Sequence, residues 1–169
     1  MPAPAGLIRS RHAMESARAR HALREETRSC GPRCALQWVR CRGGCLQDCP
    51  DGLCSNKSVV MAAVQQHGRA LGYADGSLKA DRDVVMAAVQ QDGRALEHAG
   101  GGLRADKHVV MAAVRQTWCA VHYADGRLLA DKDVVMPAVR QDWRALGYAA
   151  GGLRADRDVV MAAVRQDWR

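Results

Sequence analysis

The sequence contains no phenylalanine, and tryptophan and tyrosine together bring the aromatic fraction to only 4%. A chain of this kind lacks the rows of aromatic platforms on which many proteins stack single-stranded nucleic acid. Long hydrophobic runs are missing as well, since the longest, 84–89, has six residues. A transmembrane helix needs roughly 20 apolar residues, so we predict no membrane segment.

A secretion signal is also missing, because no apolar stretch of about seven or more residues lies near the start of the sequence. We therefore expect a soluble, intracellular protein, with the cytoplasm as its compartment. The residues before Glu15 include two arginines and no acid, a bias shared by organelle transit peptides and by basic tails. Organelle targeting by this N-terminus is the alternative.

The net charge is +7, from 25 Lys and Arg against 18 Asp and Glu. A basic balance favours acidic partners such as nucleic acid. However, Arg outnumbers Lys 21 to 4, and the residues with AT-rich codons Ile and Asn occur once each. GC-rich coding explains such an arginine content without a ligand, so nucleic acid is only a secondary expectation.

One hydrophobic block, Val-Val-Met-Ala-Ala-Val, recurs at a fixed interval of 25 residues, with Pro137 replacing an alanine once. A fixed period of this length indicates a repeat array. Residues 1–55 are expected to be a separate Arg- and Cys-rich segment, disordered or partly helical. The array is divided into four full copies and a fragment: 56–80, 81–105, 106–130, 131–155 and 156–169.

The second copy illustrates how each unit is expected to fold. Asp81 precedes the block and is a good helix N-cap, and the valines and alanines that follow cover one helix face. Asp92 would fall within that face, so the first helix should end near Gln91 and Asp92 should cap a second, shorter helix. Thr117 takes this capping role in the third copy, and Gly101 is expected as a left-handed C-cap of the second helix.

A single copy holds too few large apolar side chains to offset the entropy of ordering its backbone. Stacked copies bury both flanks of each unit, which is how α-solenoids become stable. The predicted fold class is therefore all-α, a short α-solenoid of 25-residue helix-turn-helix repeats with a mostly irregular N-terminal segment. Because the last unit has no closing neighbour, self-association through this uncapped C-terminal repeat is also expected.

The pattern Asp-x-x-Val-Val-x-x-Ala-Val-x-x-Asp-Gly-x-Ala-Leu-x-x-Ala…Leu-x-x-Asp in 81–106 resembles the tandem repeats of domain of unknown function 4116. The resemblance covers 56–169 and implies short helical repeats. It implies no catalytic residues, and 1–55 has no counterpart in it. The glycine of the pattern is kept in two copies and replaced by tryptophan in the others: Gly68, Gly93, Trp118, Trp143 and Trp168.

Six of the seven cysteines lie within 1–55. Cys30 and Cys34, and likewise Cys41 and Cys45, form two C-x3-C pairs. Thiolates bind Zn²⁺ tetrahedrally, and structural zinc sites usually join two such pairs through a longer loop. These four cysteines are the candidate ligands of a zinc site. Reduced thiols without structure and disulfides are the two alternatives that the spacing leaves open.

Residues that recur in every copy are interpreted as structural, so a site is sought where the copies differ. Cys119 and His122 share a predicted helix face and suit a metal pair or a Cys–His nucleophile. No third ligand or orienting carboxylate accompanies them, so sequence drift is the preferred interpretation and no catalytic residue is assigned. A ladder of arginines offers a basic groove to an acidic peptide or nucleic acid, or else a solvated face: Arg69, Arg94, Arg144 and Arg169.

These patterns predict a non-enzymatic scaffold that binds a protein partner through its repeat surface and needs no cofactor. The alternative is a zinc- or nucleic-acid-binding protein that acts through the Cys- and Arg-rich N-terminus. A hydrolase using Cys119 and His122 is the third hypothesis.

A peptide of residues 81–105 should be unfolded in water, because it cannot bury its apolar face without neighbouring copies. Far-ultraviolet circular dichroism of the peptide should show coil and no cooperative melting. A compact, cooperatively melting helical monomer would contradict the repeat interpretation.

Overall fold

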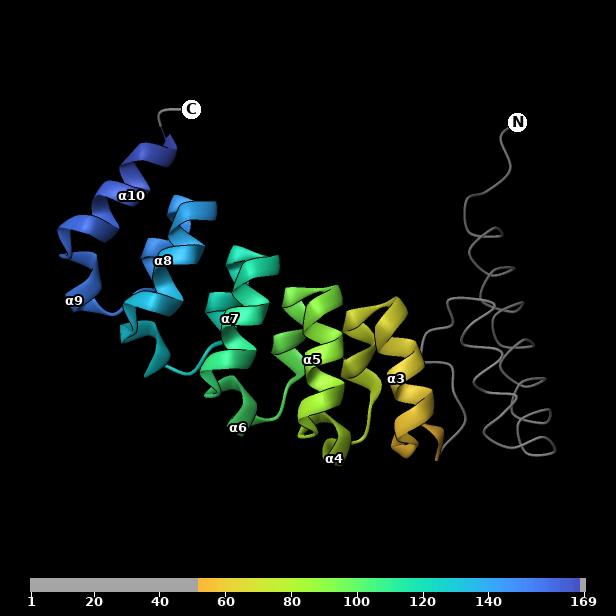
Figure 1. Cartoon of the computed structure of the whole chain (residues 1–169). Coiled ribbons are helices and arrows are strands. Elements are labelled where there is room, and N and C mark those ends of the chain that lie inside the picture. The colour runs from red at the N-terminus through yellow and green to blue at the C-terminus, as the bar shows by residue number, and fades with distance from the viewer. Residues whose placement is uncertain (1–51, 168–169) are drawn as a thin grey trace, which may run out of the picture.

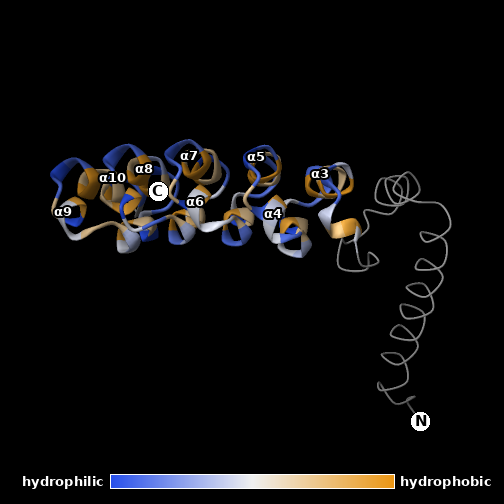
Figure 2. Cartoon of the chain, turned by 90° about the horizontal axis from the view of Figure 1, so that it is seen from below, coloured by the Kyte–Doolittle hydropathy of each residue, from blue (hydrophilic) through white to orange (hydrophobic). Residues whose placement is uncertain are grey.

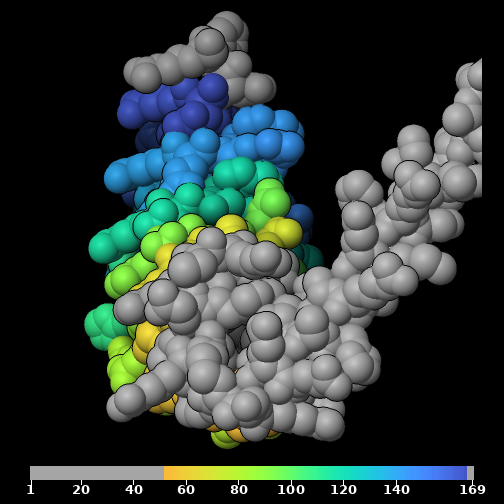
Figure 3. Space-filling model, turned by 90° about the vertical axis from the view of Figure 1, so that its right-hand side faces the viewer, coloured from red at the N-terminus to blue at the C-terminus, as the bar shows by residue number. Residues whose placement is uncertain are grey.

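Short helices form two rows in the computed structural model, which describes residues 52–167 (Figures 1 and 2). This part of the chain contains no strand, and none of its helices has the length and apolar character needed to span a membrane. In Figure 3, seen from one end, the copies follow one another in colour order from yellow to blue. The all-α fold of stacked helical repeats is confirmed. The expectations for residues 1–51 lie outside the described residues.

Each copy contributes one α-helix of three turns to the first row, which we call the α row. The second row, called the 3-10 row, holds a 3-10 helix and a helix of about one turn from each of the four full copies, and the one-turn helix η2 that precedes them. The α row comprises α3 (Lys57–Gln66), α5 (Arg82–Gln91), α7 (Lys107–Gln116), α8 (Lys132–Gln141) and α10 (Arg157–Asp167). The 3-10 row comprises η3 (Gly68–Tyr73), η4 (Gly93–His98), η5 (Trp118–Tyr123) and η7 (Trp143–Tyr148), with the one-turn helices η2 (Leu53–Ser55), α4 (Gly76–Lys79), α6 (Gly101–Arg104), η6 (Leu128–Ala130) and α9 (Gly151–Arg154).

Aspartates lie at both ends of α5 and α8, as predicted, whereas Asn56 and His67 flank α3 and Thr117 follows α7. The side chain of Asp81 accepts hydrogen bonds from the backbone N–H groups of Asp83 and Val84, which caps α5. The helix ends at Gln91 because Asp92 adopts an extended conformation. The same ten-residue length recurs in α8, although Pro137 lies inside that helix.

The second helix of each copy is a 3-10 helix of six residues, tighter than the helix that the sequence predicted. Asp92 caps η4 by accepting from the N–H of Arg94. Thr117 makes no such side-chain bond at η5, so its predicted capping role is wrong. The backbone N–H of Ala95 donates to the carbonyl of Asp92, and that of Ala99 donates to the carbonyl of Leu96. Hydrogen bonds over three residues are typical of a 3-10 helix, which has about three residues per turn. Ala95 and Ala99 are buried, with 0% and 2% of their surface exposed.

The predicted left-handed glycine cap is wrong. Gly101 is the first residue of α6, and Gly52 is the one glycine with positive φ in residues 52–167. Ala99 and Gly100 are extended, with ψ of 146° and 148°, and the chain then enters a new helical turn. A glycine at the first helical position and one at a C-cap look alike in sequence, so the pattern alone did not separate them.

The extended residue before each one-turn helix ties its copy to the preceding one. The N–H of Gly100 donates to the carbonyl of Lys79 at 2.8 Å, and the N–H of Asp125 donates to the carbonyl of Arg104 at 2.9 Å. Asp75 and Ala150 make the same bond at 2.9 Å. Successive copies therefore share one backbone hydrogen bond at the same place, which fixes how they are aligned.

The core lies between the two rows, where the hydrophobic helix faces of Figure 2 meet. Val84, Val85, Ala88 and Val89 of α5 are each 0% exposed. Their counterparts in α3, α7 and α8 are at most 2% exposed, and all belong to one continuous cluster. The sequence pattern identified this core correctly.

Burial of the last valine depends on the following copy. Val139 of α8 is 0% exposed because η7 of its own copy and α10 of the next pack beside α8, whereas Val164, the equivalent residue of α10, has neither neighbour among the described residues and is 45% exposed. The two residues occupy the same place in their copies. A neighbour on each side is thus required to bury both flanks of a unit.

Glycine allows the first copies to approach closely. A Cβ atom on Gly93 would lie 2.4 Å from the carbonyl oxygen of Ala113, and one on Gly68 would lie 2.4 Å from that of Ala88. Trp118 occupies the equivalent position in the third copy and packs against the core. The spacing between copies must differ there, and in Figure 1 the α row climbs from α7 through α8 to α10 after the side-by-side α3 and α5.

Substituting Gly93→Ala should lower the free energy of unfolding by about 1–3 kcal/mol, because the new methyl group meets a backbone carbonyl that cannot move aside. Urea denaturation of the full chain measures this change. Gly101→Ala is the matched control, since its Cβ would meet nothing within 4 Å and alanine favours a helix. Equal midpoints for Gly93→Ala and the unchanged protein would contradict the close approach.

Candidate interaction surfaces

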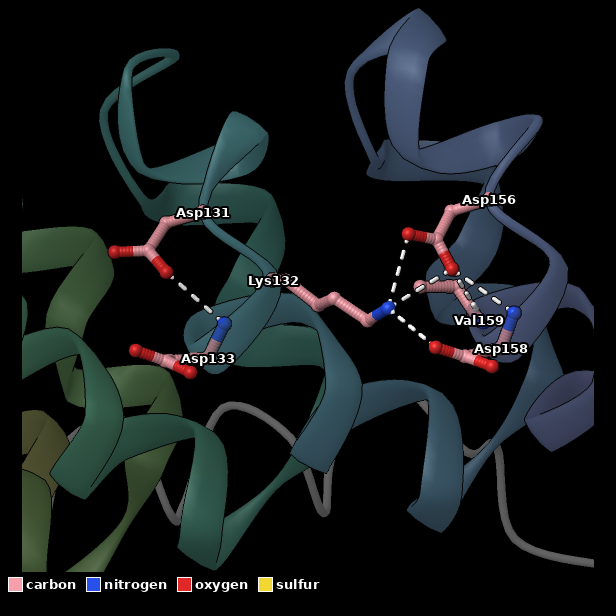
Figure 4. Close-up of polar contacts among 6 residues, drawn as sticks. All are labelled: Asp131, Lys132, Asp133, Asp156, Asp158 and Val159. Atoms are coloured by element: carbon pink, nitrogen blue, oxygen red, sulfur yellow. Dashed lines mark hydrogen bonds and ion pairs between the residues drawn. The ribbon is translucent and has the colours of Figure 1, made fainter.

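One edge of the stack, where the α helices begin, carries most of its ion pairs. Lys132 lies in the first turn of α8, and its Nζ is 2.9 Å from an Oδ of Asp156 and 2.8 Å from an Oδ of Asp158 (Figure 4). Asp156 meanwhile accepts from the backbone N–H groups of Asp158 and Val159, which open α10. One carboxylate therefore caps its own helix and binds the preceding copy.

This arrangement repeats along the edge. Lys57 contacts Asp81 at 2.7 Å and Asp83 at 3.3 Å. Arg82 of the second copy lies 3.5 Å from Asp106 of the third. The third copy has His108 in place of the second aspartate. Lys107 pairs likewise with Asp131 at 2.7 Å and Asp133 at 2.8 Å. The Asp-x-Asp pairs are thus capping and copy-joining residues.

The ion pairs shift the pKa values of their members in opposite directions. The hydrogen bond from Lys107 lowers the pKa of Asp131, and hydrogen bonds from Lys57 and Lys132 do the same for Asp81 and Asp156. The pKa of each lysine is raised by the carboxylates it meets. Both members are therefore charged at neutral pH.

Cys119 and His122, the predicted metal pair or nucleophile, make separate contacts on η5. The Nε of Arg94 donates to the Sγ of Cys119 at 3.3 Å. The ring of His122 packs against Tyr123 and Tyr148, with centroids 5.2 and 5.0 Å away. Within residues 52–167 no group of three or more His, Cys, Asp or Glu side chains is placed to hold a metal ion. The candidate zinc ligands Cys30, Cys34, Cys41 and Cys45 lie outside the described residues.

The predicted arginine ladder is occupied by local contacts. Arg69 lies 3.3 Å from Asp92 of the next copy, and Arg94 reaches the cysteine described above. Arg144 pairs with Asp142 at 2.6 Å and covers the ring of Trp118 at 5.0 Å. The fourth member, Arg169, lies outside the described residues. The ladder is therefore largely engaged within the protein.

A second arginine row, which sequence analysis missed, lies where the α helices end. Arg115, Arg140 and Arg165 occupy the last turns of α7, α8 and α10. All three side chains are exposed, and no acidic side chain of residues 52–167 forms an ion pair with them. The signal was present in the sequence, because the first two copies have Gln65 and Gln90 at this position.

Glutamines beside this second row hold neighbouring helix ends together. Gln141 Nε2 donates to the carbonyl of Val114 at 2.7 Å, and Gln166 Nε2 donates to that of Arg140. Carbonyls in the last turn of a helix have no partner within it. The glutamines supply that partner from the next copy, and they leave the arginine side chains free to face solvent.

Comparison with known proteins gave one kind of match. The family model described as Domain of unknown function (DUF4116) matches 34–79, 59–104, 81–129, 106–154 and 131–169. The first match begins at Cys34, so the expectation that residues 1–55 have no counterpart is wrong for their last part. Gly43 and Leu46, at the offsets of Gly93 and Leu96, were the available signal. Curated proteins and solved structures gave no match.

The lysine–aspartate pairs should make stability fall in acid. Because the pKa of Asp131 is lowered on folding, its contribution is present above the unfolded pKa and is lost as pH falls below about 4. Asp131→Asn should keep the cap, as Asn56 does for α3, but lose the charge. Urea midpoints at pH 7 and pH 3 should then differ less than in the unchanged protein.

Asp125→Asn is the control, since Asp125 accepts from the backbone N–H of Arg127 and has no ion-pair partner in the described part of the chain. An equal loss of the pH dependence of stability in both variants would show that the ion pair with Lys107 does not cause that dependence. Asp131→Ala should cost about 1 kcal/mol more than Asp131→Asn, because it also removes the cap.

Proposed function

The chain belongs to the family described as Domain of unknown function (DUF4116), and we propose that it is a non-enzymatic scaffold, a helical solenoid that binds a protein partner through its repeat surface. The proposal is supported by where repeated and variable residues lie. The recurring valines fill the core, and the recurring aspartates and glutamines join the copies. Several side chains that differ between copies, such as Gln90 and Arg115, lie on the surface.

Recurring buried residues combined with variable surface residues are typical of repeat proteins that bind other proteins. A stack in which each unit contacts its neighbours gives a long, continuous surface for its size. Helices in contact lie about 8–10 Å apart, so the described α row presents side chains at regular steps. Changing exposed residues in one copy alters the surface there without disturbing the buried valines.

The polar side chains of the repeat support the same proposal. Asp81, Asp131 and Asp156 are each held by a lysine and by the backbone of their own helix. Carboxylates held in this way maintain alignment between copies. The surface arginines at the helix ends are among the charged groups that remain for a partner.

Cross-linking mass spectrometry on the full chain tests this function. A partner isolated with the protein should form a stoichiometric complex, and its cross-links should fall on residues 57–166. A variant with serine at Cys30, Cys34, Cys41 and Cys45 should bind equally well. Loss of binding in that variant, together with zinc in the unchanged protein, would favour the N-terminal alternative.

A further inference from the structure

A groove crosses the α row between α8 and α10. Its volume is about 760 Å³, and it is lined by Met136 and Met161 in its middle. Lys132 and Arg157 line it where the two helices begin, and Arg140 and Arg165 where they end. The groove is therefore apolar in its centre and basic at both ends.

Three of the four cations in the groove form no ion pair within residues 52–167. Lys132 is held by Asp156 and Asp158, and its charge is satisfied within the protein. Arg140, Arg157 and Arg165 are exposed and form no ion pair with the described residues. Asp158, the acid in the lining, is already bound to the lysine. The groove thus carries an uncompensated positive charge.

The floor of the groove fits an apolar surface and not a row of bases. Met161 is 44% exposed, and Met136 is partly buried beside it. Methionine side chains are flexible and adapt to varied apolar partners. The lining contains no aromatic ring, and such rings are what single-stranded nucleic acid stacks on. A ligand with both acidic and apolar groups matches this lining best.

The spacing of the cations indicates the shape of the ligand. Arg157 and Arg165 are eight residues apart on one helix, which is about 12 Å at 1.5 Å per residue. Acids placed about two turns apart on another helix would meet both ends of the groove. An apolar stripe between those acids would lie on the methionines, as amphipathic helices lie in hydrophobic grooves.

We propose that the groove between α8 and α10 binds an acidic amphipathic helix of a partner protein. Leucine-like side chains of that helix pack on Met136 and Met161, and its carboxylates pair with Arg140, Arg157 and Arg165. This assignment rests on the proposed scaffold function and specifies the surface that carries it.

The chain itself supplies the matched substitution for a test. Arg140→Gln with Arg165→Gln introduces the residue that stands at the equivalent positions 65 and 90, so the helices should form unchanged. Circular dichroism and urea midpoints verify this. The control, Lys79→Gln with Arg127→Gln, removes the same charge from the 3-10 row, far from the groove.

The probe is a helical peptide of about 18 residues with a leucine stripe and glutamates eight residues apart. Fluorescence anisotropy with the full chain should show saturable binding that weakens with salt. The Arg140→Gln, Arg165→Gln variant should bind about tenfold more weakly, and Met161→Gln should weaken binding as well. The control variant should bind like the unchanged protein.

Other outcomes overturn the assignment. Equal binding by the arginine variant and the unchanged protein would show that the groove is not the site. Equal affinity for a scrambled peptide of the same charge would remove the need for an apolar stripe. Displacement of the peptide by an equimolar single-stranded oligonucleotide would assign the arginines to nucleic acid, and displacement by laurate would assign the groove to anionic lipids.

The two proposals fail in different ways. If a protein partner cross-links to the repeats and still binds the Arg140→Gln, Arg165→Gln variant, the scaffold function stands and the groove assignment is wrong. If the peptide binds as expected but no partner cross-links to residues 57–166, the groove is a peptide site and the scaffold function is wrong.

Discussion

Packing of each copy against the next is the interaction on which the rest of the structure depends. Val139 is fully buried, because its unit has its own 3-10 helix and a following copy, whereas Val164, whose unit has neither among the described residues, is 45% exposed. A unit with two neighbours buries both flanks of its valine face, which a single unit cannot do. We therefore expect the stability of this chain to be a property of the array, since the buried residues of the described copies form one continuous cluster.

Polar contacts between copies have a different role from the valines. Apolar packing is not directional, so it would permit neighbouring units to slide or rotate. The backbone hydrogen bond from Gly100 to the carbonyl of Lys79 and the ion pair between Lys132 and Asp156 are directional, so they fix the alignment of neighbouring copies. Both contacts recur at the repeat interval, and together they keep the surface residues of successive copies in line.

Much of the fold could be predicted because it depends on local pattern. Asp81 and Asp92 mark the limits of α5, and the valines between them define its buried face. The status of Gly101 could not be predicted, since glycine suits a C-cap and a first helical turn equally well, and only the backbone of Ala99 distinguishes them. The groove at Met136 was also beyond the sequence, because its shape comes from the packing of two helices.

The difference between Gly93 and Trp118 affects the angle at which adjoining copies pack, and so the position of the far end of the array. At the joints with glycine, adjoining units nest against a backbone carbonyl, whereas Trp118 packs against the core beneath Arg144 of the next copy and Trp143 is 49% exposed. A small change of angle at one joint displaces every unit beyond it, by an amount that grows with distance. One codon per repeat is thus enough to redirect the far end of the stack, while the valines within each unit stay as they are. Curvature and core can therefore evolve separately in such a chain.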